Sequence, residues 1–197
     1  MQGLRDFLIH FTLANEQDIA DANALGSSAT FLMEDAYYYG LMMCQQILGR
    51  ERTRALYPAA SAASAGLRFG LHSDSPVTPP YPLFSIWTAK TRNAQQPSWY
   101  PNEDRDRCPV IMSPEESISI AQGIKAYTID AAWAYGLENE LGSIEPGKTA
   151  DLVILSANPL EMEGNPDRLK SVRVLATVHL GKQFDNPEAN EAPIWPE

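Results

Sequence analysis

Apolar and polar residues alternate along the first 136 residues in a pattern that predicts three strands with helices between them. The three apolar runs have the length and composition of strands, and the segments between them carry apolar residues at helical spacing. The predicted strands are residues 4–11, 27–33 and 67–74. Because strands that alternate with helices commonly pair in parallel, an α/β region with helical crossovers is predicted.

The helix after the first strand is marked at both of its ends. Asn15 followed by Asp18 has the form of an N-cap with an acidic residue at position N3. Gly26 stands where the chain leaves a helix with positive φ at little cost. A helix is therefore predicted over about residues 15–25.

A second helix start is predicted before the last part of this region. Ser113 stands at the N-cap, Pro114 at the first helical position, and Glu116 where it would complete a capping box. The helical pattern continues to Gly136, so one long helix is predicted over residues 113–136. Other helical segments are predicted at 37–49, 51–66 and 82–92, with a long loop over 93–112.

After Gly136 the pattern changes from helical to strand-like. Residues 141–160 hold short apolar runs around a Glu-Pro-Gly-Lys turn. Residues 172–184 alternate like a strand, with a Gly-Lys turn near the end. A small β region is predicted here. The predicted boundaries are 1–136 for the α/β part, 137–184 for the β part and 185–197 for a tail.

The charge of the chain limits its partners. Lys and Arg number 15 against 25 Asp and Glu, so the net charge is −10 over 197 residues. Nucleic acids and anionic membranes favour clustered positive charge, and neither is expected as a partner. No run of 18 apolar residues occurs, so no transmembrane helix is predicted.

The two cysteines, Cys44 and Cys108, lie far apart and form no CxxC or zinc-finger spacing. Free thiols in a reducing compartment are therefore predicted, and Cys44 is expected to lie in the core beside two methionines. The start of the chain, MQGLRDFLIHF, carries a charge pair and no small-residue cleavage site, unlike a signal peptide. Cytoplasmic localisation is the prediction by elimination.

Polar residues at the ends of two predicted strands are the candidates for chemistry. His10 closes the first strand, and His72 lies two residues before Asp74, so the last two side chains share one face. A lone histidine such as His10 is more often structural than a ligand. Asp74 is compatible both with a turn residue before Ser-Pro and with an acid at the mouth of an active site. For His72, a structural role is as well supported as a role in contacting substrate or orienting Asp74.

Among three further residues, only for Trp99 is a functional role as well supported as a structural one. Trp99, in the long loop, fits the wall of a substrate pocket and a loop anchor equally well. His179 is expected to be a solvated or packed residue of the terminal β region. Arg92, at the end of a helix, is expected to be a solvated charge or a partner of the helix dipole.

Five segments follow one another in an order that carries a family resemblance. They are FLIHFTLANEQDIADANALG (7–26), AYYYG (36–40), FGLHSDSPVTPP (69–80), SPEESISIAQGIKAYTIDAAWAYGLENELGSIEPGKTADLVILSANPL (113–160) and VLATVHLGK (174–182). This order resembles the C-terminal part of the amidohydrolase superfamily, in particular amidohydrolase family 3, which includes N-substituted formamide deformylase-like proteins. The resemblance implies an α/β fold, namely the C-terminal portion of a (β/α)8 TIM-type barrel plus part of a small β-sandwich.

The resemblance also implies a chemistry. In that family one or two divalent metal ions, here expected to be Zn²⁺, bind at the carboxyl ends of the barrel strands, and an activated water attacks a C–N bond. Carried onto this sequence, His10 becomes a metal ligand, and Asp74 becomes both a metal ligand and the catalytic acid or base. His72 and Trp99 are the candidate substrate-binding residues for a small amide-type molecule.

The sequence departs from the family pattern in two ways. No HxH pair is present, and Asp35 stands near a position where relatives often have a histidine. The chain is therefore expected to be a C-terminal fragment of a metal-dependent hydrolase of C–N bonds other than peptide bonds. The alternative is a non-catalytic module that completes a barrel with a partner chain, or associates with itself, through open sheet edges.

Overall fold

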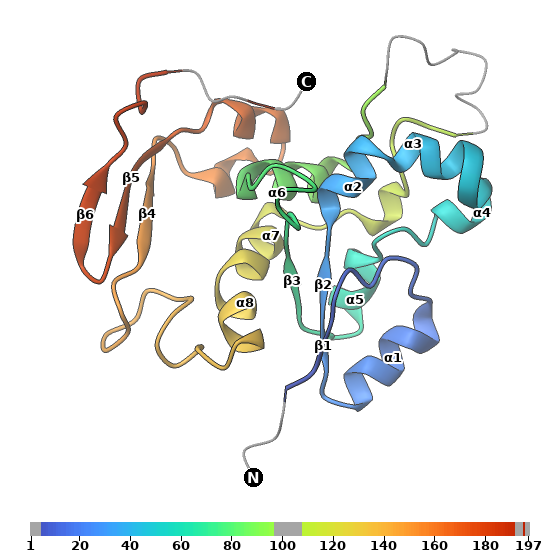
Figure 1. The fold of residues 1–197 in the computed structure, drawn as a ribbon, viewed down its shortest axis with the longest axis horizontal. Coiled ribbons are helices and arrows are strands. Elements are labelled where there is room, and N and C mark those ends of the chain that lie inside the picture. The colour runs from blue at the N-terminus through green and yellow to red at the C-terminus, as the bar shows by residue number, and fades with distance from the viewer. Residues whose placement is uncertain (1–4, 97–107, 192–194, 196–197) are drawn as a thin grey trace.

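The computed structural model describes residues 5–96, 108–191 and 195, and contains two separate sheets (Figure 1). The first sheet has three parallel strands, and the second has three antiparallel strands. Helices surround the parallel sheet, whereas the antiparallel sheet stands beside this helical part (Figure 1). No helix within the described ranges is long and apolar enough to cross a membrane.

The parallel sheet has the strand order β1-β2-β3. Its strands are β1 (Phe7–Leu8), β2 (Ser28–Phe31) and β3 (Phe69–Leu71). Each is shorter than the apolar run that predicts it. The run that predicts β2, for example, continues through Leu32 into α2, which begins at Met33. Helices connect the strands, so all three carboxyl ends lie at one edge of the sheet, and the predicted parallel α/β region is confirmed.

Helices and single helical turns make up the connections. Between β1 and β2 lies α1 (Glu16–Ala24). Between β2 and β3 lie α2 (Met33–Tyr38), α3 (Gly40–Met42), the π-helical η1 (Met43–Leu48), α4 (Gly49–Thr53) and α5 (Ala59–Ser64). After β3 come α6 (Pro82–Thr91), the 3₁₀ turn η3 (Pro114–Glu116), α7 (Ile120–Tyr127) and α8 (Ile129–Ala134).

The start of α1 confirms the capping motif predicted from the sequence. The Asn15 side chain accepts hydrogen bonds from the backbone N–H groups of Gln17 and Asp18, and the Asp18 carboxylate accepts one from the Asn15 N–H at 2.9 Å. Gly26 follows the helix with φ of +70°, a conformation that strains residues with a Cβ. The helix therefore starts and ends where the local sequence indicates.

The single long helix predicted over 113–136 is wrong. The chain makes η3, then breaks, and α7 starts at Ile120 with a capping box formed by Ser119 and Gln122. Glu116 does not cap a helix, because its carboxylate accepts hydrogen bonds from the backbone N–H and hydroxyl of Ser61. A contact across 55 residues has therefore replaced the local bond that the motif indicates.

The main core lies between the parallel sheet and the helices around it. It contains Phe31, Phe69 and Leu71 from the strands, together with Ile86 of α6 and Ile120 of α7. α7 and α8 pack against β3, while α1 packs against β2. This packing holds the three strand ends in fixed positions relative to one another.

The antiparallel sheet consists of β4 (Leu152–Leu155), β5 (Val174–His179) and β6 (Lys182–Asp185). The short 3₁₀ helices η4 (Pro159–Met162) and η5 (Pro166–Ser171) lie between β4 and β5. The sequence predicts a strand-like stretch over 172–184 with a Gly-Lys turn near its end, and the structure has a hairpin there. Its two turn residues, Leu180 and Gly181, both have positive φ. Two-residue turns of this kind match the twist of paired strands.

A disulfide joins Cys44 and Cys108, so the prediction of free thiols is wrong. The two residues are 64 positions apart, and they meet because Leu41, Ala94 and Met112 form a small apolar cluster around them. Sequence spacing carries no information about such a contact. Because disulfides persist in oxidising compartments, the bond also removes the argument for a reducing compartment that rests on free thiols.

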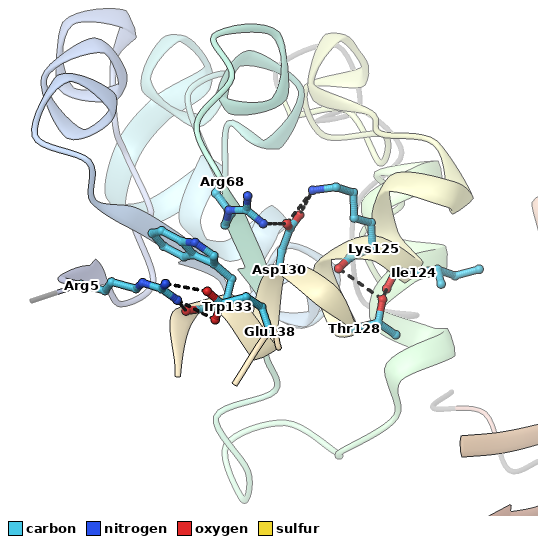
Figure 2. A network of polar contacts seen from close by, with 8 residues as sticks. All are labelled: Arg5, Arg68, Ile124, Lys125, Thr128, Asp130, Trp133 and Glu138. Atoms are coloured by element: carbon cyan, nitrogen blue, oxygen red, sulfur yellow. Dashed lines mark hydrogen bonds and ion pairs between the residues drawn. The ribbon is translucent and has the colours of Figure 1, made fainter. Parts of the chain in front are cut away.

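A polar network closes the amino-terminal end of the parallel sheet (Figure 2). The guanidinium groups of Arg5 and Arg68 lie 4.6 and 4.8 Å from the centroid of the Trp133 ring. Arg5 also pairs with Glu138, and Arg68 pairs with Asp130 at 2.7 Å. These contacts tie the starts of β1 and β3 to α8, at the end of the sheet opposite the candidate site.

Candidate functional site

The carboxyl ends of the parallel strands bring together His10, His72 and Asp74. His10 follows β1, whereas His72 and Asp74 follow β3. His10 Nε2 lies 3.8 Å from Asp74 Oδ2, and the ring centroids of the two histidines are 4.9 Å apart. Side chains more than 60 positions apart in the sequence therefore share one small region, although β2 lies between the two strands that they follow.

The backbone at this edge of the sheet adopts an uncommon conformation. His10, Phe11 and Asp74 have φ values of +69°, +39° and +51°. Residues with a Cβ rarely adopt positive φ, and they keep it where the surrounding structure enforces it, often at functional sites. The Thr30 hydroxyl of β2 accepts a hydrogen bond from the His10 N–H at 3.3 Å and so contributes to holding the first turn.

One ring nitrogen of His72, Nε2, is buried without a hydrogen-bond partner among the described residues. Burial lowers the pKa of His72, the nearby imidazole of His10 lowers it further, and Asp74 opposes the shift. The ring is therefore held in its neutral form, in which one nitrogen accepts and the other donates a hydrogen bond.

Asp35 lies close to these residues. It is on α2, which begins directly after β2, the strand between β1 and β3. Burial raises its pKa, while a 2.6 Å hydrogen bond from the Tyr57 hydroxyl and the charge of His10 lower it, and the charge of Asp74 raises it. In the sequence Asp35 stands out only as a departure from the family pattern, although its place after a strand marks the same edge of the sheet.

Glu34 supports the loop that carries Asp74. The Thr78 hydroxyl donates a 2.8 Å hydrogen bond to Glu34 Oε2 and also contacts the backbone carbonyl of Ser73. Glu34 is fully buried, its Oε1 has no partner among the described residues, and burial raises its pKa to about 8. The carboxyl group is therefore largely protonated at neutral pH.

Arg92 is buried, so the expectation of a solvated charge is wrong. Its guanidinium donates hydrogen bonds to the backbone carbonyls of Leu56 at 2.6 Å, Tyr57 at 3.3 Å and Met112 at 2.9 Å. Burial lowers the pKa of Arg92 to about 10, which leaves it charged at neutral pH. Its role in the structure is to hold the backbone of Tyr57, the residue whose hydroxyl contacts Asp35.

Two other candidates stand apart from this region. Trp99 lies outside the described residues, so its predicted part in substrate binding stays a prediction. His179 lies on β5 of the other sheet, where its Nδ1 is 3.2 Å from Asp151, and its side chain is mostly exposed. This agrees with the expectation of a solvated strand residue.

The donor set at the strand ends fits part of a metal centre. Imidazole and carboxylate are ligands that zinc takes, and His10 and Asp74 already lie within 4 Å of each other. Within residues 5–96, 108–191 and 195, no three His, Cys, Asp or Glu side chains are gathered closely enough to hold a metal ion. A zinc site uses at least three protein ligands, so His10 and Asp74 alone do not complete one.

The chain matches the family model described as "Amidohydrolase family" over residues 1–184. N-substituted formamide deformylase of Arthrobacter pascens is 33% identical over 122 residues, which cover 62% of this chain and 20% of that protein. Protein LONG AFTER FAR-RED 3 of Arabidopsis thaliana is 40% identical over 138 residues, 70% of this chain and 21% of that protein. The chain thus spans about a fifth of the length of these relatives.

Solved structures share the fold at low sequence identity. An uncharacterized metal-dependent hydrolase from Pyrococcus horikoshii OT3 is similar with a TM-score of 0.65 at 18% identity, over 81% of this chain and 30% of that one. An amidohydrolase from Thermotoga maritima MSB8 is similar with a TM-score of 0.58 at 20% identity, over 91% and 37%. The mixed α/β fold agrees with the family model, and the match over residues 1–184 shows that this chain belongs to the amidohydrolase family.

Proposed function

We propose that this chain forms the C-terminal part of a metal-dependent hydrolase that cleaves C–N bonds other than peptide bonds. In this proposal residues 1–136 supply the last three strands of a (β/α)8 barrel, residues 137–184 supply part of a small β-sandwich, and residues 185–197 form a tail. The convergence of His10, His72 and Asp74 at the carboxyl ends of parallel strands carries the proposal. In barrel enzymes this end of the strands is where catalytic residues lie.

The proposed roles follow from the chemistry of each side chain. His10 and Asp74 would hold a divalent ion, for which we propose Zn²⁺. Such an ion, when bound, lowers the pKa of water towards ~7 and polarises a carbonyl oxygen. The Asp74 carboxylate takes a proton from the attacking water and passes it to the leaving nitrogen. His72 offers its unpartnered Nε2 to a polar group of the substrate.

The substrate class in this proposal is a small amide. Support comes from the family match and from the similarity to a protein named as a deformylase of N-substituted formamides. A neutral His72 and a carboxylate beside it suit a substrate that has both a carbonyl acceptor and a nitrogen that must gain a proton. Residues supplied by other strands of the barrel would complete the ligand set.

Zinc binding by this chain, joined to the barrel strands that supply the remaining ligands, tests the assignment of His10 and Asp74. His10→Ala and Asp74→Asn are expected to weaken zinc affinity by ~10-fold or more, measured by isothermal titration calorimetry. Asn tolerates the positive φ at position 74, so D74N retains the turn. In a complete barrel the same D74N change is expected to lower formate release from N-substituted formamides by ~100-fold or more.

His179→Ala is the matched control for the zinc experiment. It removes an imidazole that pairs with Asp151 in the other sheet, so zinc affinity is expected to stay as in the wild type. Zinc affinity that falls with H179A and survives H10A would contradict the proposed site. Undiminished formate release by D74N would contradict the role of Asp74 in proton transfer.

A second candidate function is a non-catalytic module that completes the barrel of a partner chain. The outer position of β1 in its sheet favours it, because the backbone of an outer strand is available for pairing. Apolar side chains at this edge are exposed, with Leu8 at 39%, Ile9 at 61% and Leu13 at 44%. An exposed apolar edge of this kind fits association with another strand better than it fits a solvated surface.

A further inference from the structure

The disulfide between Cys44 and Cys108 borders a cavity that takes no part in the proposed hydrolysis. We propose that this disulfide is a site of thiol–disulfide exchange, in which a small thiol enters the cavity and attacks the sulfur of Cys44, and that the bond clamps residues 108–113 in place. The inference goes beyond the proposed function and is independent of it, because neither a metal ion nor hydrolysis takes part.

The cavity gives a small molecule access to one of the two sulfur atoms. It has a volume of about 380 Å³, which is in the range of small-molecule sites. Its described lining includes Cys44, Thr53 and Met112 but not Cys108. The two cysteines are otherwise enclosed, with 2% of Cys44 and 4% of Cys108 exposed. A thiol that approaches through the cavity therefore meets Cys44 Sγ, and Cys108 Sγ is the leaving group.

The charges that line the cavity favour the attacking group. Arg50 and Arg54 belong to the lining, and Glu115 is the one carboxylate among the described lining residues. Arg54 also pairs with Glu51 at 3.7 Å, where both side chains are exposed. The attacking group in disulfide exchange is a thiolate, which is an anion. An excess of positive charge beside Cys44 therefore favours its approach.

The exchange takes place in two steps. In the first step a thiolate forms a bond to Cys44 Sγ, the bond between the two cysteines breaks, and Cys108 leaves as a thiolate that takes a proton from water. In the second step another thiolate attacks the outer sulfur of the mixed disulfide, and Cys44 leaves and is protonated in the same way. The protein disulfide gains two electrons, and two molecules of the small thiol are oxidised to their own disulfide.

The disulfide holds a segment that is also hydrogen-bonded to the residues after α6. The Ala94 N–H donates a hydrogen bond of 2.7 Å to the carbonyl of Val110, and the Met112 N–H donates one of 2.8 Å to the carbonyl of Arg92. Arg92 Nε in turn donates to the carbonyl of Met112 at 2.9 Å. These bonds begin two residues after Cys108. The disulfide therefore fixes the segment close to the point where its hydrogen bonding starts.

The same segment is joined to α4 and to the residues that follow α4. The Ser113 hydroxyl donates a hydrogen bond of 3.0 Å to the carbonyl of Thr53. The guanidinium of Arg92, which binds the segment, donates to the carbonyls of Leu56 and Tyr57. Opening the disulfide removes the covalent constraint on residues 108–113. Their hydrogen bonds are then expected to open more often, together with those of Arg92.

The first experiment locates the attacked sulfur in the folded chain. The full chain is treated with 2-mercaptoethanol for short times, new thiols are alkylated with iodoacetamide, and mass spectrometry of peptides locates both groups. The expected early product carries mercaptoethanol on Cys44 and the alkyl group on Cys108. The reverse arrangement overturns the attack at Cys44. A reaction rate that rises with low urea as steeply as global unfolding does would overturn exchange in the folded state.

The second experiment tests the charges of the cavity. Arg50→Gln and Arg54→Gln are each expected to slow the exchange about twofold or more at low salt, and less at high salt. Arg52→Gln is the matched control, because Arg52 lies on the same helix outside the described lining, with its Nε bonded to the carbonyl of Leu48. It is expected to react as the wild type does. An equal loss in all three variants overturns the role of the cavity.

The third experiment tests the clamp in the chain reduced with a phosphine. Because the bond joins residues 64 positions apart, its loss is expected to lower the melting temperature by about 10 °C. Hydrogen exchange at the Ala94 and Met112 amides is expected to become ~10-fold faster or more, with β4 and β5 unchanged. The double variant Cys44→Ala with Cys108→Ala should not respond to the phosphine. Unchanged exchange at both amides, or equal acceleration in β4 and β5, overturns the clamp.

Discussion

Glu34 is a carboxylic acid buried in the interior of the protein, and the described residues give a hydrogen bond to only one of its two oxygens. Enclosure disfavours the charged form, which is why its pKa rises from 4.5 to about 8. The folded protein therefore keeps a proton that the unfolded chain releases at lower pH. Since Glu34 also braces the loop before Asp74 through Thr78, its protonation state bears on the site.

The free energy of unfolding is expected to depend on the protonation of Glu34. Because the folded pKa lies above the unfolded value, this contribution is fully present below about pH 4.5 and is lost as the pH rises towards about 8. The expected slope is up to ~1.4 kcal/mol per pH unit in this window. Glu34→Gln carries no titratable group and should remove that slope. Urea unfolding of both proteins at several pH values measures it.

Glu51→Gln is the control for this pH experiment, because Glu51 is exposed on α4 and its pair with Arg54 lies at the surface. Its pH dependence is expected to match that of the wild type. If E34Q and wild type lose stability in parallel between these two pH values, the raised pKa of Glu34 is wrong.

At the residue scale, the sequence indicates His10 and Asp74 because each ends an apolar run, which is a local feature. It does not indicate that Tyr57 contacts Asp35, 22 residues away, or that Arg92 is buried. Both depend on contacts between segments that lie far apart in the chain. These supporting contacts therefore needed the tertiary structure, whereas the positions of His10 and Asp74 after strands were predictable.

Among the helices, α6 and α7 approach each other at Gly123. A Cβ at this position would lie 2.9 Å from Ile86 Cγ2 and 3.0 Å from Ile86 Cγ1, closer than carbon atoms pack. Ile86 is buried, with 3% of its surface exposed, so it has little room to move away. Gly123 is thus required for close packing of the helices, even though glycine weakens an isolated helix.

Gly123→Ala is expected to destabilise the protein by ~1–3 kcal/mol, because overpacking outweighs the gain in helix propensity of ~1 kcal/mol. Ile86→Ala removes both γ carbons that the new Cβ would meet, so Gly123→Ala is expected to cost less in the Ile86→Ala background than in the wild type. Urea unfolding of the wild type, the single variants and the double variant measures the coupling.

Gly164→Ala is the control for this prediction, because a Cβ at Gly164 would have no atom within 4 Å. Its free energy of unfolding is expected to stay close to that of the wild type. A stabilised G123A protein would show that α6 and α7 separate easily, which would contradict tight packing at this contact.

At the element scale, the capping motif of α1 was predictable because its residues bind only one another. The similar motif at Ser113 gave a wrong helix start. Glu116 instead binds Ser61, and the Ser113 hydroxyl donates a hydrogen bond to the carbonyl of Thr53. The turn between β5 and β6 was predicted one position too late, at Gly-Lys instead of Leu180-Gly181. The observed turn carries a leucine where turns of this kind usually carry Asn or Asp.

For the molecule as a whole, the two ends of the parallel sheet differ in character. The amino-terminal end is tied by the contacts of Arg5 and Arg68 with Trp133, as Figure 2 shows, and by the ion pairs of these arginines. The carboxyl end carries the candidate site on strained turns. This division between a structural end and a chemical end is typical of barrel enzymes.

The exposed apolar edge at β1 leads to a prediction about association. The chain is expected to self-associate at high concentration, or to bind a polypeptide that supplies the preceding barrel strands, because both bury this edge. Ile9→Lys places a charge there and should shift the chain towards the monomer. Light scattering coupled to size-exclusion chromatography measures the molar mass across a range of concentrations.

Ile47→Lys is a suitable control, because Ile47 is 60% exposed on η1, away from the strand edge. It is expected to leave the molar mass as in the wild type. A wild-type chain that stays monomeric at all concentrations and melts sharply would contradict the proposal that this edge is an interface.

The sequence by itself determined the alternation of strands and helices, the start and end of α1, and the placement of His10, His72 and Asp74 at strand ends. These features depend on periodicity and on neighbours a few positions apart. Only the tertiary structure decided the Cys44–Cys108 disulfide, across 64 positions, and the burial of Arg92. Such contacts depend on which surfaces pack together, and that is set by the whole folded chain.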